Sequence, residues 1–252
     1  LRAEVARRDA RQELPFAGAT AAAVWGMWQH GYPDDVVFLD RWKGGGRSEP
    51  GVRRITAAAA TAGLRRVDGQ LVTDVARTAI DVARAGDFAT AVGPLDWALW
   101  RRNPHRVSRE ELVAELDKLP SPLRRRFVER AVVFASPLSD SYAESLVRAL
   151  MHRLGYEPPE LQAEFPHAAG VYVVDFAWRA HRVIVEFDGF GKYLDPAMNR
   201  GDPARVVLAE KLREDELRRM GCTVVRIYWS DLMDPVGLAA KLDAAGVPRG
   251  RR

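Results

Sequence analysis

Two short β-prone runs, residues 171–178 and 183–187, lie four residues apart in the second half of the chain. Valine, isoleucine and aromatic side chains dominate both runs, as is typical of strands. If the intervening residues form a hairpin loop, counting outward from that loop pairs Asp175 with Glu186. Residues directly opposite each other on antiparallel strands share a sheet face, with Cβ atoms about 4.5–5.5 Å apart. We therefore expect two carboxylates to face each other on this hairpin.

Two carboxylates in this arrangement repel each other, so a bound divalent cation is the simplest reason for a fold to keep them. Asp188 follows Glu186 by two residues and is expected on the same face, which makes it a third candidate oxygen ligand. Mg²⁺ takes one or two protein carboxylates and completes its coordination with water and phosphate oxygens, as phosphodiester hydrolysis requires. Solvent-facing carboxylates are the alternative, and the apolar residues that share a face with Asp175, namely Val171, Val173 and Ala177, argue against it. The pattern predicts a Mg²⁺ or Mn²⁺ site at Asp175, Glu186 and Asp188.

The order of elements around this hairpin indicates an α/β unit with a mixed sheet between helices. In chain order, the pattern predicts a helix over 141–154, the two strands, a helix over 204–220 and a strand over 223–228. The organisation of the chain changes near Ser136, so we expect two domains, 1–135 and 136–252.

The first domain is expected to be mainly helical, with a small sheet. The expected helices lie near 17–28, after a cap at Thr73, near 89–100 and after the capping box of Ser108 and Glu111; the expected strands are 36–39 and 52–55. The glycine triplet 44–46 lies between those strands and lacks the Gly-Lys-Ser/Thr ending of a P-loop, so we interpret it as a hairpin loop.

Composition excludes several classes of protein. No run approaches the roughly 18 apolar residues that span a bilayer, so a membrane span is excluded. The single cysteine, Cys222, allows neither an intramolecular disulfide nor a cysteine-rich zinc site, which fits a reducing, cytoplasmic setting. The sequence begins at Leu1 rather than Met, so we expect a trimmed chain from which an N-terminal module is missing.

Positive charge is concentrated in the middle of the chain. The 38 Lys and Arg residues exceed the 34 Asp and Glu residues by four, which alone is weak evidence for an acidic partner. Six central arginines are candidate contacts to a DNA backbone, namely Arg101, Arg102, Arg106, Arg124, Arg125 and Arg126. A solvated helix face is the alternative interpretation of such runs.

Several motifs of the second half occur in a fixed order. A helix that carries Glu144 is followed by Val-Asp-Phe at 174–176, Glu-Phe-Asp-Gly at 186–189 and Arg-Glu-Asp-x-Leu-Arg-x-x-Gly at 213–221. This succession, over roughly residues 137–245, resembles the very-short-patch-repair-like branch of the restriction-endonuclease-like, or PD-(D/E)xK, nuclease superfamily. The resemblance implies a restriction-endonuclease-like core and a metal-dependent nuclease that cuts DNA in phage defence or DNA repair.

The resemblance also implies roles for individual residues. Asp175 and Glu186 hold the metal, and Glu144 supplements them from its helix, although the sequence around Glu144 also fits a helix capping box. Asp188 stands where the superfamily has a lysine, so Lys192, just after the Asp-Gly turn, becomes the candidate for stabilising charge on the phosphate. A loop lysine in solvent is the alternative for Lys192.

Three further positions are candidates for supporting roles. Gln162 resembles the family's glutamine before the first core strand, which orients a metal-bound water or a phosphate; a surface glutamine is the alternative. Lys211 and Asp215 are expected beside a core-facing stripe formed by Leu208 and Leu212. There they would contact or support the phosphate, or would form a salt bridge that covers the sheet.

The first half resembles the region that follows the winged helix in AbiEi-type abortive-infection antitoxins. The matching segments are Ala-Ala-Ala-Val-Trp-Gly at 21–26 and Val-Thr-Asp-Val-Ala-Arg-Thr-Ala-Ile-Asp at 72–81. Because Leu1 lies close upstream, we expect the DNA-binding winged helix to be absent or incomplete. This resemblance implies an alternative function, a catalytically inactive DNA-binding regulator of a toxin–antitoxin system. A module that blocks a toxin through protein contact is a third hypothesis.

Overall fold

The computed structural model describes residues 13–31, 34–40, 50–56, 61–119, 122–168, 170–189 and 203–250. Contacts divide the chain into two units, Leu1–Ser145 and Leu146–Arg252. The division falls inside helix α7 (Tyr142–Arg153), whereas the boundary predicted from the sequence, 135/136, lies in the loop before that helix. No helix within the described ranges is both long enough and apolar enough to cross a membrane.

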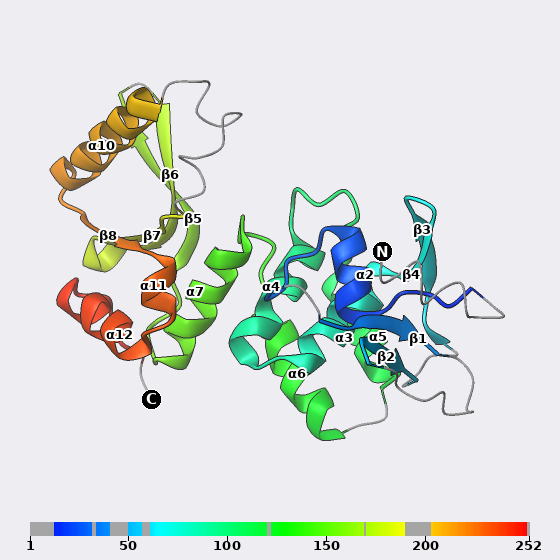
Figure 1. The fold of residues 1–252 in the computed structure, drawn as a ribbon. Helices are drawn as coiled ribbons and strands as arrows, with labels where there is room; N and C mark the ends of the chain where they lie inside the picture. Colours follow the sequence, from blue (N-terminus) through cyan, green and yellow to red (C-terminus); the bar gives the residue numbers. More distant parts are fainter. Residues whose placement is uncertain are drawn as a thin grey trace. The chain divides into compact units, whose positions relative to one another are not determined.

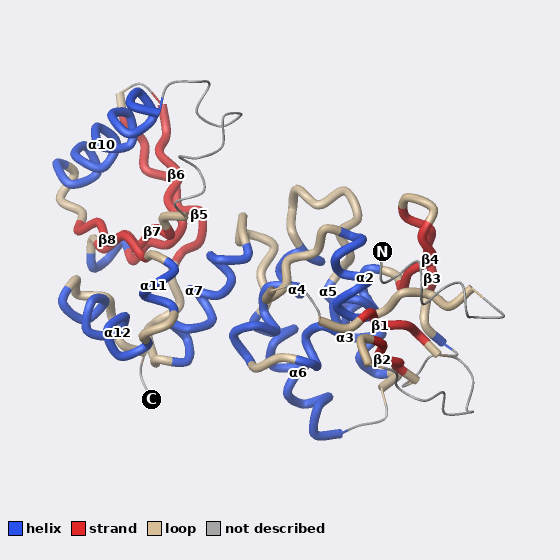
Figure 2. Tube along the Cα trace, viewed as in Figure 1, coloured by secondary structure: helices blue, strands red, loops and turns tan. Residues whose placement is uncertain are grey.

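The first unit is mainly helical, as predicted, and carries small two-stranded sheets (Figure 2). Its helices are α2 (Gly18–Trp25), α3 (Val75–Ala85), α4 (Phe88–Leu99), α5 (Arg109–Asp117) and α6 (Pro122–Phe134). Its strands are β1 (Val36–Leu39), β2 (Val52–Ile55), β3 (Leu64–Val67) and β4 (Gln70–Thr73). The apolar faces of these five helices form one core, in which Ile80, Leu95, Leu112 and Val128 are fully buried.

Helix α3 begins one residue later than predicted. Asp74, not Thr73, is the N-cap, because its side chain accepts a backbone N–H of the first turn at 2.9 Å. Thr73 ends β4, and its hydroxyl lies 2.7 Å from that of Thr78. Aspartate and threonine are both good caps, so the local sequence did not separate the two positions. The capping box of Ser108 and Glu111 at the start of α5 is confirmed.

Strands β1 and β2 are confirmed, but they pair differently from the expectation. They run parallel, with Val36 opposite Val52 and Leu39 opposite Ile55. Parallel neighbours are not joined by a tight hairpin, so the hairpin interpretation of the segment between them is wrong. The glycine triplet 44–46 itself lies outside the described residues.

The second unit is built around a mixed sheet with the strand order β5-β6-β7-β8. The strands are β5 (Glu160–His167), β6 (Gly170–Trp178), β7 (Val183–Phe187) and β8 (Thr223–Ile227), and the remaining helices are α10 (Pro203–Arg219), α11 (Trp229–Leu232) and α12 (Pro235–Ala244). Strands β7 and β8 run parallel, which requires the crossover that α10 supplies; the other neighbours are antiparallel. Figure 1 shows α10 on one face of the sheet and α7 and α12 on the other. The predicted α/β fold, a mixed sheet flanked by helices, is confirmed.

The β6–β7 hairpin has the predicted four-residue loop. Trp178 pairs with Val183, and the loop consists of a 3₁₀ turn (Arg179–His181) followed by Arg182 in the left-handed conformation. On the face toward α10, the buried residues Val174, Ala177, Ile184 and Val224 pack with Leu217 of that helix. The position of the carboxylates on the hairpin therefore follows from a loop of fixed length.

Strand β5 is not predicted by the sequence. Its eight residues include two glutamates and a proline, a composition that disfavours a strand. The strand forms because its backbone pairs with β6 from Glu160, opposite Ala177, to His167, opposite Gly170. The β3–β4 hairpin and helices α6, α11 and α12 are likewise absent from the prediction.

Candidate functional site

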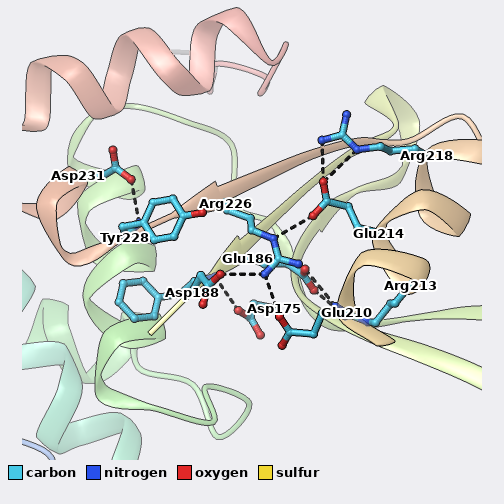
Figure 3. Close-up of polar contacts among 11 residues, drawn as sticks. Asp175, Glu186, Asp188, Glu210, Arg213, Glu214, Arg218, Arg226, Tyr228 and Asp231 are labelled. Atoms are coloured by element: carbon cyan, nitrogen blue, oxygen red, sulfur yellow. Dashed lines mark hydrogen bonds and ion pairs between the residues drawn. The ribbon is translucent and has the colours of Figure 1, made fainter. Parts of the chain in front are cut away.

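Strands β6 and β7 separate at Asp175, and the carboxylate of this residue occupies the point of separation (Figure 3). The backbone ladder between the two strands ends with Phe176 opposite Val185. Asp175 Oδ2 then accepts the backbone N–H of Phe187 at 2.8 Å. Beyond this point β7 continues alongside β8. The register predicted from the loop length is confirmed as far as Phe176 and Val185, but the ladder stops one position before the predicted pair of Asp175 and Glu186.

Glu186 is nearly buried and is held by an arginine of α10. Its side chain is 10% exposed, and its two oxygens accept from Arg213 Nη1 and Nη2 at 3.1 and 2.6 Å. Arg213 Nη2 also donates to the backbone carbonyl of Val173 at 2.6 Å. A bidentate pair of this kind fixes the carboxylate and compensates its charge, so the burial of Glu186 does not leave an unpaired anion.

Asp188 directly follows β7 and pairs with an arginine of β8. Its backbone N–H donates to the carbonyl of Ile227 at 2.8 Å, and its Oδ2 accepts from Arg226 Nη1 at 3.0 Å. Arg226 Nε donates to Glu214 Oε2 at 2.9 Å, and Arg226 Nη1 lies 3.6 Å from Glu210. One guanidinium therefore links Asp188 with two carboxylates of α10 (Figure 3). Arg226, although it lies in an apolar strand, is therefore paired with acidic side chains.

These charges shift the pKa values of their neighbours. Burial acts to lower the pKa of Arg226, but the hydrogen bond to Glu214 and the charges of three nearby carboxylates raise it overall. Burial acts to raise the pKa of Glu214, but hydrogen bonds from Arg226 and Arg218 bring it below its usual value. Both groups therefore stay charged at neutral pH.

We call this group the carboxylate cluster; it consists of Asp175, Glu186, Asp188, Glu210 and Glu214 with Arg213, Arg218 and Arg226. Carboxylate oxygens are the ligands that Mg²⁺ and Mn²⁺ take in proteins. In the part of the chain that the structure describes, however, no three His, Cys, Asp or Glu side chains are arranged to hold a metal ion together. A cation at this place would therefore have at most two of these carboxylates as ligands, which Mg²⁺ accepts when water and phosphate complete its coordination.

Gln162 lies inside β5 in the left-handed backbone conformation, with φ at +49°. The pairs on either side of it in the β5–β6 register bring it opposite Asp175. The other non-glycine residues with positive φ in the described ranges, Asp68 and Arg182, lie in turns between strands. A strained residue inside a strand is unusual, and such residues gather at functional sites. Gln162 therefore lies opposite Asp175 in the sheet, and its supporting role stays a prediction.

Glu144 caps helix α7. Its Oε1 accepts the hydroxyl of Ser141 and its Oε2 accepts the backbone N–H of Asp140, both at 2.8 Å. The hydroxyl oxygen of Ser141 in turn accepts the backbone N–H of Glu144 at 3.1 Å. The structural interpretation of Glu144 as part of a helix cap is therefore confirmed in a variant form, in which Glu144 accepts the N–H of Asp140, one residue before the cap. Lys192, the predicted charge-stabilising residue, lies outside the described residues.

Helix α10 presents a different face to the sheet from the one predicted. Leu208 and Leu212 are 56% and 53% exposed, and Lys211 and Asp215 are exposed on the same side. The residues toward the sheet, at spacings of three and four, are Glu210, Arg213, Glu214 and Leu217. The expected core-facing stripe with Lys211 and Asp215 beside it is wrong, because ion pairs to β7 and β8 turn a charged face inward.

Arg213 is the site residue that sequence reasoning missed. The sequence feature that could have identified it is a stripe of residues at spacings of three and four, as on a buried helix face, but mostly charged. The stripe consists of Glu210, Arg213, Glu214 and Leu217. That stripe becomes informative only when a buried carboxylate on the neighbouring strand is known to need a partner.

Two of the six central arginines share one partner in the first unit. Arg101 and Arg102 follow α4 and lie 3.6 and 3.1 Å from the carboxylate of Asp140. Arg106 is exposed and donates to the carbonyl of Arg101 at 3.4 Å. Ion pairs this exposed are weak, so these side chains stay accessible to a partner.

The three arginines of α6 differ from one another. Arg125 pairs with Asp117, Arg124 lies over the ring of Phe127 at 5.8 Å, and Arg126 is exposed. Consecutive residues of a helix point in directions about 100° apart. A run of three arginines in the sequence is therefore not one positive surface in the structure.

No family model matches the chain. Uncharacterized protein Rv2248 of Mycobacterium tuberculosis, strain ATCC 25618 / H37Rv, is 31% identical over 225 residues, which cover 88% of this chain and 78% of that protein. Uncharacterized protein MT2308 of strain CDC 1551 / Oshkosh matches to the same extent. A solved structure, the crystal structure of RV2827C protein from Mycobacterium tuberculosis, has 20% identity and a TM-score of 0.34 over 59% of this chain and 56% of that chain. The identity to Rv2248 and MT2308, over most of both lengths, shows that this chain belongs to their family.

Proposed function

We propose that the second unit is a metal-dependent nuclease-like domain that acts on phosphodiester bonds of DNA, in the cytoplasm, in phage defence or DNA repair. The observation that carries the proposal is the gathering of Asp175, Glu186 and Asp188 around one residue, Phe187. Asp175 accepts the N–H of Phe187 at 2.8 Å, and the other two carboxylates flank Phe187 in the sequence. Carboxylates at neighbouring positions of a sheet favour a cation as their partner.

In this proposal a bound Mg²⁺ or Mn²⁺ ion supplies a Lewis acid and an activated water. Asp175 and Glu186 hold the ion; Asp188, the third predicted ligand, is paired with Arg226 instead, in keeping with the lack of a three-ligand group among the described residues. Arg213 neutralises Glu186 while the ion is absent, and its planar guanidinium also suits a phosphate oxygen. Gln162, Glu144 and Lys192 keep the supporting roles that the resemblance implies.

The central arginines are proposed to hold the DNA backbone electrostatically. Four of them suit this role best, because they are exposed or held only by weak surface ion pairs. These are Arg101, Arg102, Arg106 and Arg126. Lys211 is exposed on the outer side of α10, so its contact with phosphate would be made there.

One observation favours a second candidate function. Arg213 and Arg226 already neutralise Glu186 and Asp188, so the cluster is compensated without any cation. Carboxylates that arginines of the same domain already neutralise suit a catalytically inactive, DNA-binding regulator of the antitoxin type. A toxin would be a further partner of such a regulator.

Cleavage assays separate the two functions. The full chain is incubated with supercoiled plasmid and with short mismatched duplexes, in Mg²⁺ or Mn²⁺, beside Asp175→Asn, Glu186→Gln and the control Glu129→Gln. Glu129 is an exposed carboxylate of α6 and lies outside the carboxylate cluster. Metal-dependent cutting by wild type and control that both cluster variants lose supports the nuclease. Salt-sensitive DNA binding without cutting favours the regulator, and the absence of both activities contradicts both functions.

A further inference from the structure

Strand β2 and helices α3 and α6 surround a cavity of about 290 Å³ in the first unit. Its lining contains Arg53 and Arg54 of β2, Arg84 of α3 and Arg124 of α6. Among the described lining residues, Asp81 is the single carboxylate. We call this cavity the arginine pocket; its four guanidinium groups come from three elements that are distant in the sequence.

The carboxylates near the pocket compensate only part of its charge. Asp81 Oδ2 accepts from the fully buried Arg77 at 2.7 Å, and Arg84 lies 3.6 Å from the other oxygen of Asp81. Arg54 lies 3.4 Å from Asp40. Within the described ranges, Arg53 and Arg124 have no ion pair with any carboxylate.

A second cavity adjoins the arginine pocket and shares three of its lining residues, Arg53, Asp81 and Ala85. This neighbour also contains Asp34 and Asp35, which are both exposed. The acidic side chains confine the positive potential to the side of the pocket that Arg54, Arg84 and Arg124 line. A small anion is therefore favoured there over an extended polyanion.

Two buried polar atoms of the lining have no hydrogen-bond partner. Arg54 Nε is a donor without an acceptor, and Asp81 Oδ1 is an acceptor without a donor. Buried polar groups are almost always satisfied, so an orphaned pair in one cavity points to a molecule that completes both bonds. That molecule must present an anionic oxygen to Arg54 and a hydroxyl to Asp81.

A terminal phosphate with its sugar meets both requirements. Its anionic oxygens match guanidinium groups in charge and geometry. Its second proton has a pKa near 6, so at neutral pH a phosphate monoester is mainly the dianion and the hydroxyl that donates to Asp81 comes from the sugar of the nucleotide. A phosphodiester inside a strand carries only one negative charge, so it matches the guanidinium groups less well. The pocket is slightly smaller than the roughly 300–1,000 Å³ of sites for drug-sized ligands, which suits a phosphate and part of its sugar.

We propose that the arginine pocket binds the terminal phosphate of a nucleotide, either free or at the 5′ end of a strand. The proposal does not rest on the carboxylate cluster, because every residue that carries it belongs to the first unit.

The test is calorimetric titration of the full chain with inorganic phosphate, adenosine 5′-monophosphate, adenosine, and one oligonucleotide with and without a 5′-phosphate. We expect the monophosphate to bind and adenosine to fail. Arg124→Gln and Arg54→Lys should each weaken binding about tenfold. Lysine keeps the charge of Arg54 but removes its Nε donor. Arg130→Gln is the matched control, since Arg130 is exposed on the same helix as Arg124 and lies outside the lining.

The two oligonucleotides identify the source of the phosphate. A preference for the phosphorylated oligonucleotide over the monophosphate assigns the pocket to strand ends, and the opposite preference assigns it to free nucleotides. Equal binding of adenosine and its monophosphate overturns the proposal, as does the failure of every phosphate probe to bind. Wild-type affinity of Arg124→Gln also overturns it; Arg124 is exposed, so this variant folds even if Arg54→Lys does not.

Discussion

Asp175 and Phe187 are joined by a 2.8 Å hydrogen bond from the backbone N–H of Phe187 to the Asp175 carboxylate. The bond lies where β6 and β7 stop pairing, one register position beyond Phe176 and Val185. A single side chain therefore takes over from the ladder and places a negative charge at the backbone N–H of the residue that follows Glu186. These two contributions of Asp175 can be separated by substitution.

Asp175→Asn should unfold at nearly the urea concentration of the wild type, because its side-chain oxygen still accepts the N–H of Phe187. Asp175→Ala should lower the free energy of unfolding by about 1–2 kcal/mol, since a buried N–H loses its partner. Equal destabilisation by both substitutions would show that the charge of Asp175, not its hydrogen bond, supports the fold. Under the proposed function, metal-dependent cutting is lost in both.

Arg213→Gln should lower the free energy of unfolding by about 1–3 kcal/mol, because Glu186 then carries an uncompensated charge. The lower part of that range is favoured, since the Arg213 side chain is 23% exposed. If Glu186 binds a cation, added Mn²⁺ should raise the Tm of this variant more than that of the wild type.

The matched control for this variant is Arg219→Gln. Arg219 is exposed on the same helix and makes no hydrogen bond or ion pair within the described ranges. Equal Tm values for the Arg213 and Arg219 variants in metal-free buffer would contradict the stabilising role of the Arg213–Glu186 pair.

Gln162→Gly should be more stable than Gln162→Ala by about 1 kcal/mol. The reason is the left-handed backbone at this position, with φ at +49°, which glycine adopts freely and alanine does not. Thermal unfolding of the two variants measures the difference. Arg182, with φ at +55° in the hairpin loop, offers the same comparison away from the cluster. A more stable alanine variant at 162 would show that this backbone conformation is not retained in solution.

The stability of the protein should fall in acid partly through Glu214. Burial alone would raise its pKa, but hydrogen bonds from Arg226 and Arg218 lower it from the ordinary value of 4.5. A carboxyl group with a depressed folded pKa contributes stability above its unfolded pKa and loses it as pH falls through the folded value. Urea unfolding between pH 3 and about 6 should therefore show a shallower decline below pH 4.5 for Glu214→Gln than for wild type. If the free energy of unfolding falls with pH as steeply in Glu214→Gln as in wild type and in the control Glu129→Gln, Glu214 does not contribute to the acid sensitivity of the fold.

The sequence by itself determined the features that depend on neighbouring residues. Side-chain alternation and a loop of four residues determined the pairing of β6 with β7, and so the positions of Asp175 and Glu186. Local hydrogen bonding determined the caps at Ser108 and Ser141. These features were predictable because strand alternation and capping act over a few residues of chain.

Only the tertiary structure decided the features that join distant segments. Strand β5 exists because its backbone pairs with β6, in spite of a composition that disfavours a strand. Helix α10 turns Arg213 rather than Leu212 toward the sheet, because the buried carboxylate of Glu186 on β7 requires a positively charged partner. The arginine pocket likewise brings together side chains that are far apart in the sequence, from Arg53 of β2 to Arg124 of α6. Periodicity identifies an apolar face, but a charged face is buried only when its partners are supplied by the rest of the fold.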